Sequence, residues 1–194
     1  MKGMRKSELY VIFYLLQDKK HLTNTVREIA SDLSMSVGSV FNTLKLLQEE
    51  GFLIENKGVR LLRKRSQLID LWAKGYAEIL KNKLLIARFT FISPIVRTNW
   101  QSIIMPGGLS WGGEPAVALQ DGFLQPEQWD IYTADNANAL IATARMIPDP
   151  QGEIFVYKCF WSSEGTPLLV VYADLLATGD DRCREAAERI KSLI

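Results

Sequence analysis

A helical segment that leads directly into a hairpin signal is the feature that most narrows the folds open to this chain. Residues 36–51, SVGSVFNTLKLLQEEG, carry apolar residues at steps of three and four, with Ser36 as an expected N-cap and Gly51 as an expected C′ residue. Two short apolar strands follow, over 52–55 and 59–62, about an Asn-Lys-Gly turn. This order predicts a capped helix followed by a two-stranded ribbon.

Two further helical segments precede this pair. Residues 7–17 are an apolar helical run, and residues 23–33, TNTVREIASDL, place apolar side chains on one helix face. Three helices and a hairpin in this order predict a winged helix-turn-helix over residues 1–65. In such a domain the third helix enters the major groove of DNA and the hairpin, or wing, reaches neighbouring phosphates. A three-helix module that binds only protein is the alternative.

The spacing of the third helix separates a predicted core face from a predicted DNA face. The predicted core face consists of Val37, Val40, Phe41, Leu44 and Leu47. The candidate DNA contacts on this helix are the small, polar or basic residues Ser36, Ser39, Asn42, Thr43 and Lys45. The candidate phosphate contacts of the wing are the basic residues Lys57, Arg60, Arg63, Lys64 and Arg65.

The charge of the chain divides between its halves. The net charge is only +1, but residues 1–85 hold 15 Lys and Arg against 9 Asp and Glu, whereas residues 86–194 hold 8 against 13. A basic first half and an acidic second half indicate that only the first half meets a polyanion. The basic run by itself is also compatible with a solvated surface.

The second half has a different pattern. A helix over 66–85 is expected to link the halves, and it could also pair two subunits in a homodimer. Residues 86–194 then alternate short apolar strands with helices, which predicts an α+β chain whose C-terminal domain is mixed α/β. The predicted strands are 87–92, 129–134, 153–161 and 167–173, and the predicted helices are 114–122, 136–147 and 180–194.

The pair Gly112-Gly113 raises the question of phosphate chemistry. Nucleotidyltransferases follow such a pair with a strand that bears two carboxylates at alternate positions, which hold magnesium ions. Here the strand carries Asp130, but the alternate position is Tyr132. We therefore expect no catalytic residues, and the glycine pair is interpreted as a packing turn at a helix start, with Glu114 at the positive helix end.

The sequence gives little sign of a metal site, a cofactor or a membrane-spanning segment. The chain has one histidine, His21, and its two cysteines, Cys159 and Cys183, are isolated, so we expect neither a metal site nor a cofactor. Scattered cysteines, the lack of an 18-residue apolar run and the lack of an export signal predict a cytoplasmic protein.

Two stretches carry a resemblance to a known family. The segments GGLSWGGEPAVAL, residues 107–119, and PLLVVYADLLATGDDRCREAAERI, residues 167–190, resemble the AbiEi antitoxins of type IV toxin–antitoxin systems. The resemblance implies a winged-helix autorepressor that binds repeats in its own promoter. It also implies a C-terminal domain that counters a nucleotidyltransferase-like toxin, without a requirement for a stable complex.

The resemblance also suggests which residues matter in the second domain. The candidates are Gly112, Gly113, Glu114, Asp174 and Asp180. Asp174 is expected to follow a strand, where its side chain would be accessible, and Asp180 can simply cap the last helix. Two other functions stay open: a winged-helix regulator whose aromatic-rich second half binds a small ligand, and a nucleotidyltransferase-like enzyme.

Overall fold

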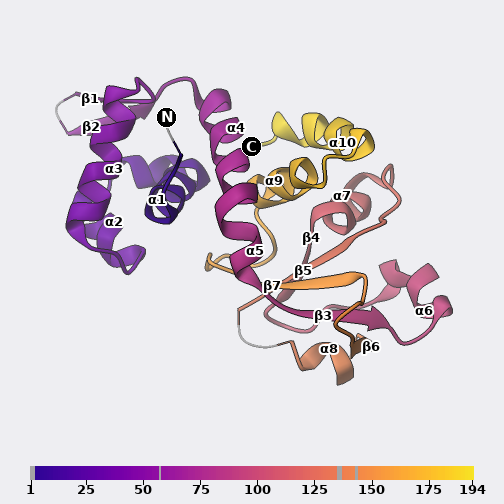
Figure 1. Ribbon diagram of the computed structural model, residues 1–194. Coiled ribbons are helices and arrows are strands. Elements are labelled where there is room, and N and C mark those ends of the chain that lie inside the picture. Colours follow the sequence, from indigo (N-terminus) through magenta and orange to yellow (C-terminus); the bar gives the residue numbers. More distant parts are fainter. Residues whose placement is uncertain (1–2, 57, 135–136, 143) are drawn as a thin grey trace. The chain divides into compact units, whose positions relative to one another are not determined.

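A computed structural model of the chain describes residues 3–56, 58–134, 137–142 and 144–194. The chain divides into two compact units, Met1–Leu80 and Lys81–Ile194, which are taken in turn below (Figure 1). The α+β composition predicted from the sequence is confirmed.

The first unit consists of helices and one hairpin. Its elements are α1 (Lys6–Gln17), a 3₁₀ turn η1 (Lys19–Thr23), α2 (Val26–Asp32), α3 (Val37–Glu49), β1 (Leu53–Asn56), β2 (Val59–Leu62), α4 (Arg65–Gly75) and a π-helical turn η2 (Tyr76–Leu80). The hairpin is antiparallel, and its register pairs Asn56 with Val59 across the turn.

Helix α1 is the centre of this unit. It is apolar on nearly every side, and every residue from Glu8 to Leu16 except Tyr10 is buried, as expected for a helix that neighbours surround. It packs against α3 and α4. The Trp72 indole N–H of α4 donates to the Leu9 carbonyl over 2.8 Å, and the Trp72 and Phe13 rings lie 5.4 Å apart. The first part of the helix expected to link the halves thus belongs to the core of the first unit.

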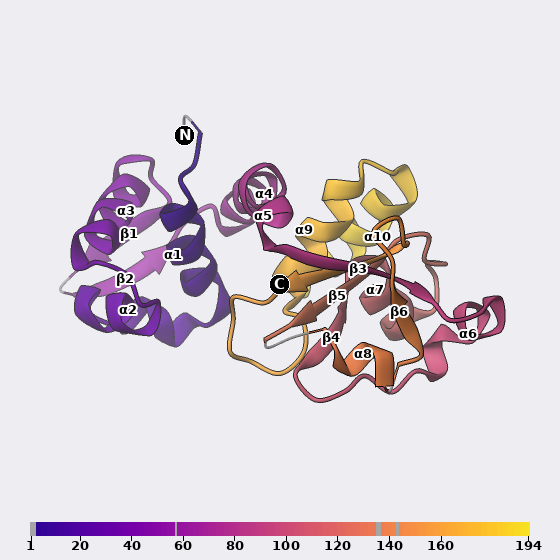
Figure 2. The same cartoon turned by 60° about the horizontal axis from the view of Figure 1, so that its bottom comes forward.

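The second unit is built on a five-stranded sheet. Its elements are α5 (Lys81–Leu84), β3 (Leu85–Phe91), α6 (Pro94–Thr98), η3 (Trp100–Ser102), β4 (Leu109–Gly112), α7 (Gly113–Asp121), β5 (Trp129–Thr133), α8 (Ala139–Ala142), β6 (Met146–Pro148), β7 (Ile154–Lys158), α9 (Leu168–Thr178) and α10 (Asp181–Lys191). The strand order is β4-β5-β7-β3-β6. Strands β5 and β7 are parallel, and the other neighbours are antiparallel (Figure 2).

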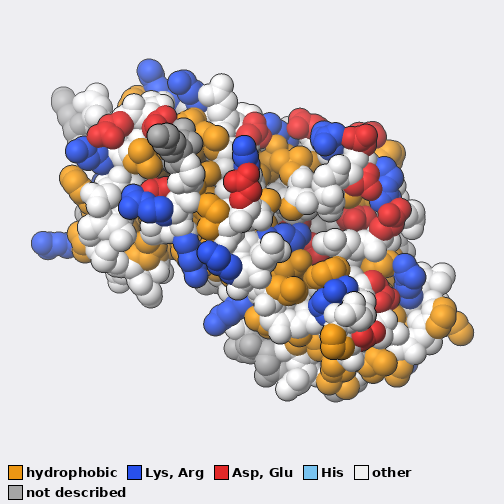
Figure 3. All heavy atoms as spheres, in the orientation of Figure 1, with side chains coloured by type: hydrophobic (Ala, Val, Ile, Leu, Met, Phe, Trp, Pro, Cys, Tyr) orange, Lys and Arg blue, Asp and Glu red, His pale blue; other side chains and the backbone are white. Residues whose placement is uncertain are grey.

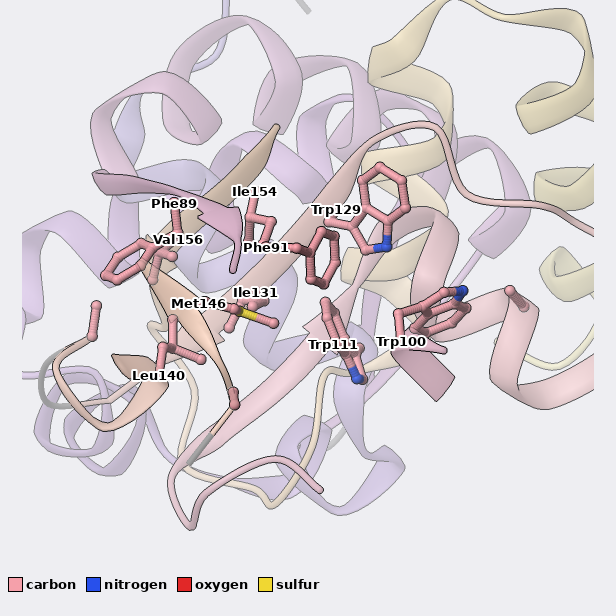
Figure 4. Close-up of a cluster of buried hydrophobic side chains, with 13 residues drawn as sticks. Phe89, Phe91, Trp100, Trp111, Trp129, Ile131, Leu140, Met146, Ile154 and Val156 are labelled. Atoms are coloured by element: carbon pink, nitrogen blue, oxygen red, sulfur yellow. The ribbon is translucent and has the colours of Figure 1, made fainter. Parts of the chain in front are cut away.

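The two faces of this sheet have different chemistry, because successive residues of a strand point to opposite faces. One face presents the main apolar cluster (Figure 4). Its members are the buried residues Phe89, Phe91, Trp100, Trp111, Ala118, Trp129, Ile131, Ala137, Leu140, Ala144, Met146, Ile154 and Val156. The alternate positions of β5 and β7 put Asp130, Tyr132 and Tyr157 on the other face, with Tyr132 directly opposite Tyr157.

One predicted element of the second unit is wrong, and another is only partly correct. Residues 167–173, predicted as a strand, begin helix α9, which starts after Pro167 and ends at Gly179 in the left-handed conformation (φ 73°). A short apolar run cannot distinguish a buried strand from a buried helix, and α9 is buried between α7 and α10. The predicted helix over 136–147 is only partly correct, since Met146–Pro148 pairs with β3 as an edge strand.

The remaining predicted elements of this unit are confirmed, whereas α6, η3 and β4 were not predicted. Helix α10 is confirmed, and Cys183 lies on its buried face. Helix α7 follows β4 directly and ends at Gly122 with φ 66°. In the described part of the chain, no helix has the length and apolar character needed to cross a membrane.

Candidate functional site

The exposed surface of helix α3 carries small and polar residues beside two apolar ones, Val37 and Phe41. Ser36 caps the helix, and its hydroxyl accepts from the Ser39 backbone N–H over 3.2 Å. A Cβ added at Gly38 would meet no atom within 4 Å, so the helix backbone is open to approach there. Asn42 and Lys45 are exposed. Lys45 lies 3.7 Å from Glu49, but an exposed ion pair of this kind is weak and readily exchanged for another partner.

The buried face of α3 is rotated from the predicted one. Thr43, predicted to contact DNA, is only 1% exposed, and its hydroxyl donates to the Ser39 carbonyl over 2.9 Å. Because that bond satisfies the hydroxyl, Thr43 can be buried in the core. Val37 and Phe41, predicted to be buried, are 48% and 56% exposed. The prediction was wrong for these three residues.

The hairpin uses one of its predicted phosphate contacts internally. Arg60 is only 7% exposed. Its Nη1 donates to the Asn24 carbonyl over 2.6 Å, and its Nε donates to Glu55 over 3.2 Å. Strand alternation puts Arg60 on the same side of the hairpin as Leu62, which faces the body of the unit. Arg60 therefore holds the hairpin against the residues before α2, and its side chain is not exposed as a phosphate contact would require.

The remaining basic residues divide between surface and core. Arg63 and Lys64 are exposed between β2 and α4, with Lys64 in the left-handed conformation (φ 51°), and Figure 3 shows Lys and Arg side chains over this connection. Arg65 donates from Nη2 to the Leu16 carbonyl over 2.9 Å, and burial lowers its pKa, so it is half-buried in structural contacts. Lys57 lies outside the described residues.

A buried charge cluster occupies the polar face of the sheet in the second unit. The ammonium Nζ of Lys81 in α5 lies 2.7 Å from Oδ2 of Asp130 in β5 and 2.9 Å from Oδ1 of Asp174 in α9. The Tyr132 hydroxyl donates to the Asp174 carboxylate at 2.9 Å, and the Gln128 amide donates to Oδ1 of Asp130 over 2.8 Å. We call Lys81, Asp130, Asp174 and Tyr132 the charge cluster.

The charge cluster has one cation for two carboxylates. Burial raises the pKa of Asp174 to about 6, against the opposing effect of the Lys81 ammonium. Burial lowers the pKa of Lys81, but Asp174 and Asp130 raise it by more, so that its pKa lies above the ordinary value. Lys81 therefore stays protonated at neutral pH. Two carboxylates converge here as they do in a metal-dependent transferase, but an ammonium group occupies the space between them.

The glycine pair is explained by this cluster. A Cβ at Gly112 would lie 2.5 Å from Cε2 of Tyr132 and 3.2 Å from Asp174, and a Cβ at Gly113 would lie 3.0 Å from Asp130. Gly113 also has φ 45°, a conformation that side chains disfavour. Only glycine lets the start of α7 lie this close to the charge cluster. The interpretation of the pair as a packing turn is confirmed, and the glycines pack against the charge cluster.

The structure places the other three predicted residues of this domain as follows. Asp174 does not follow a strand and is not accessible, because it lies within α9 and is fully buried. Asp180 caps α10, accepting from the Arg182 backbone N–H over 2.8 Å. Glu114 is buried and accepts from the Glu127 backbone N–H over 3.0 Å; burial raises its pKa, although that N–H and Arg182 oppose the shift.

Lys81 is the functional candidate that sequence reasoning missed. It lies within the helix expected to be a linker, where a lysine is normally solvated. Its only sequence signal is its position directly after the apolar residues of that helix. Among the described residues, no group of three or more His, Cys, Asp and Glu could hold a metal ion.

A cavity of about 450 Å³, which shares Tyr132 with the charge cluster, lies where β5 and β7 end. Its wall includes Tyr132, Trp161 and the loop through Gly108, and the Tyr132 and Trp161 rings are 4.9 Å apart. The carboxyl ends of parallel strands are a common place for ligands in α/β proteins.

Two sequence models of protein families match the chain. The model described as a transcriptional regulator, AbiEi antitoxin of a type IV toxin–antitoxin system, matches residues 60–194. The model described as a Firmicute plasmid replication protein, RepL, matches residues 1–77. No curated protein and no solved structure matches the chain significantly.

Proposed function

Because the chain belongs to the AbiEi family of transcriptional regulators and antitoxins of type IV toxin–antitoxin systems, we propose that it binds the repeats of its own promoter and represses transcription. The observation that carries this proposal is the open surface of α3 around Gly38, where Asn42 and Lys45 expose an amide and a positive charge. The first unit is then a winged helix whose third helix lies in the major groove.

The exposed groups of the first unit divide naturally into two roles. Asn42 can pair with the edge of a base, since an amide matches the donor and acceptor of adenine. Lys45, Arg63 and Lys64 can meet phosphates, which position the protein without reading sequence. The likeness of residues 1–77 to a plasmid replication protein is in keeping with a DNA-binding first unit.

The second unit is proposed as the antitoxin part, which counteracts a nucleotidyltransferase-like toxin without catalysing a reaction itself. The pairing of Asp130 and Asp174 with Lys81 supports a structural use of these carboxylates. A homodimer is part of the proposal, since two-fold protein symmetry would match paired promoter repeats.

The proposal is tested by DNA binding and reporter repression with the full chain. The probe is the duplex upstream of its own gene, with a scrambled duplex of the same length as reference. Asn42→Ala should reduce discrimination between the two duplexes by about 1–3 kcal/mol. The matched control is Gln48→Ala, which changes an exposed residue at the far end of the same helix. This variant should keep the full discrimination between the two duplexes.

Equal affinity of the unchanged protein for both duplexes would contradict the repressor proposal. Antitoxin action is measured separately, as growth rescue of cells that express the nucleotidyltransferase-like gene next to this one. No rescue by the full chain would contradict the antitoxin proposal and leave repression untouched.

A second candidate function is ligand-sensing regulation, favoured by the cavity beside Tyr132 and Trp161. A small molecule bound there would change the fluorescence of Trp161 and the affinity for the promoter duplex together. A screen in which no compound changes both would remove this candidate.

A further inference from the structure

The exposed face of α3 carries two apolar side chains that the core does not use. Val37 and Phe41 are 48% and 56% exposed and lie one helical turn apart. The helix instead buries Val40, Thr43, Leu44 and Leu47. Neither side chain is therefore part of the buried core of the first unit.

The surroundings of these two side chains indicate their partner. On the helix surface Phe41 has Gly38 before it and Lys45 after it, at spacings of three and four. The stretch Val37–Gln48 contains no carboxylate. The partner should therefore offer a small apolar group surrounded by negative charge. The major groove of DNA has this character, since the 5-methyl group of thymine is its apolar feature and phosphates line its rim.

The position of the two residues along the helix agrees with this partner. Recognition helices contact base edges with their N-terminal residues, and Val37 and Phe41 are the first and fifth residues of α3. Four residues of helix advance about 6 Å, which is close to two base-pair steps of about 3.4 Å each. The two side chains can thus contact thymines about two base pairs apart.

We infer that Val37 and Phe41 select thymine through its 5-methyl group, and that they determine specificity alongside Asn42. This inference rests on the proposed binding of DNA by α3. It adds a readout by apolar contact, which hydrogen-bonding residues cannot supply at the methyl group.

The test replaces thymine by uracil, which lacks only the 5-methyl group. The full chain first enriches a bound duplex from a random library, and each thymine of that duplex is then changed to uracil in turn. At the contacted positions, affinity should fall about fourfold for each methyl removed, from about 0.8 kcal/mol per buried carbon. At the base that Phe41 contacts, the Phe41→Ala variant should have the same affinity for the duplex with thymine as for the duplex with uracil.

The control is Leu61→Ala. Leu61 is 55% exposed in the hairpin of the same unit, so it matches Phe41 in exposure but lies on a different element. It should keep the preference for thymine. Circular dichroism checks that both variants are folded, which their exposed positions favour.

The outcomes separate the inference from the proposal beneath it. If no duplex is enriched, DNA binding itself fails. If a duplex is enriched but uracil binds as well as thymine at every position, or Phe41→Ala keeps the full preference, the inference is overturned. A changed sedimentation coefficient of Phe41→Ala with an unchanged thymine preference would assign Phe41 to a protein contact and overturn it as well.

Discussion

Removal of the Lys81 ammonium tests whether the charge cluster holds the second unit together. In Lys81→Met, the carboxylates of Asp130 and Asp174 lose their shared cation, which lies 2.7 and 2.9 Å away, while both stay buried. Breaking a buried ion pair from one side costs about 3–5 kcal/mol. For a unit of this size the melting temperature should fall by about 10–20 °C.

The assay is thermal unfolding of the full chain followed by tryptophan fluorescence. Four of the five tryptophans, Trp100, Trp111, Trp129 and Trp161, lie in the second unit, so the signal reports mainly on that unit. The loss should be smaller at pH 5 than at pH 7.5, because Asp174, whose pKa burial has already raised, can take up a proton and relieve the unpaired charge.

The matched control is Lys83→Met, which removes an exposed lysine from the same helix. It should change the melting temperature by little. The double variant Lys81→Met with Asp174→Asn should lose less stability than the sum of the two single variants, since it leaves one carboxylate unpaired instead of two. Equal melting temperatures for Lys81→Met and Lys83→Met would refute the reasoning.

Four further predictions concern residues of both units. Gly112→Ala forces a methyl group against the Tyr132 ring and should lower the free energy of unfolding by about 1–3 kcal/mol, measured by chemical denaturation. The control Gly107→Ala, whose methyl group would meet no atom within 4 Å, should lower it by less. Equal losses for the two variants would contradict the close approach at Gly112. Because the folded pKa of Asp174 is raised to about 6, the folded state holds more protons than the unfolded state between about pH 4 and 6. Asp174 should therefore contribute a loss of stability of up to about 3 kcal/mol as pH rises through that window. Asp174→Asn should remove this contribution, so parallel stability curves for the two proteins would count against it. Lys64→Asn, a change that keeps the left-handed conformation, should lower the slope of log affinity for the promoter duplex against log salt by about one. Arg60→Met should leave that slope unchanged and lower the melting temperature of the first unit. A lower slope with an unchanged melting temperature would instead show that Arg60 contacts DNA.

Local features of the fold could be predicted from the sequence because they depend on residues close together in the chain. Ser36 caps α3 through a backbone N–H three residues away, and Gly51 follows the helix with φ 72°. The hairpin register follows from its short turn. Asp180 caps α10 in the same local way.

The rotation of α3 and the burial of Arg60 could not be predicted by the same rules. Helical periodicity favours the face with the largest apolar side chains, and Thr43 became buried because its hydroxyl has a partner within its own helix. Arg60 became buried because the Asn24 carbonyl, 36 residues away, accepts from it. The alternation of residues in a strand cannot show which other segment of the chain the hairpin will pack against.

What the sequence determined by itself is the order and capping of most elements, the division of charge and the resemblance that the AbiEi match to residues 60–194 supports. Only the tertiary structure decided what the buried charges do. Lys81 meets Asp130 across 49 residues, and Tyr132 meets Asp174 across 42. The physical reason is that periodicity and capping arise from neighbours within one or two turns. The pairing of a buried charge depends instead on which distant segments the chain path brings together, here a helix end, a central strand and a helix that had been predicted as a strand.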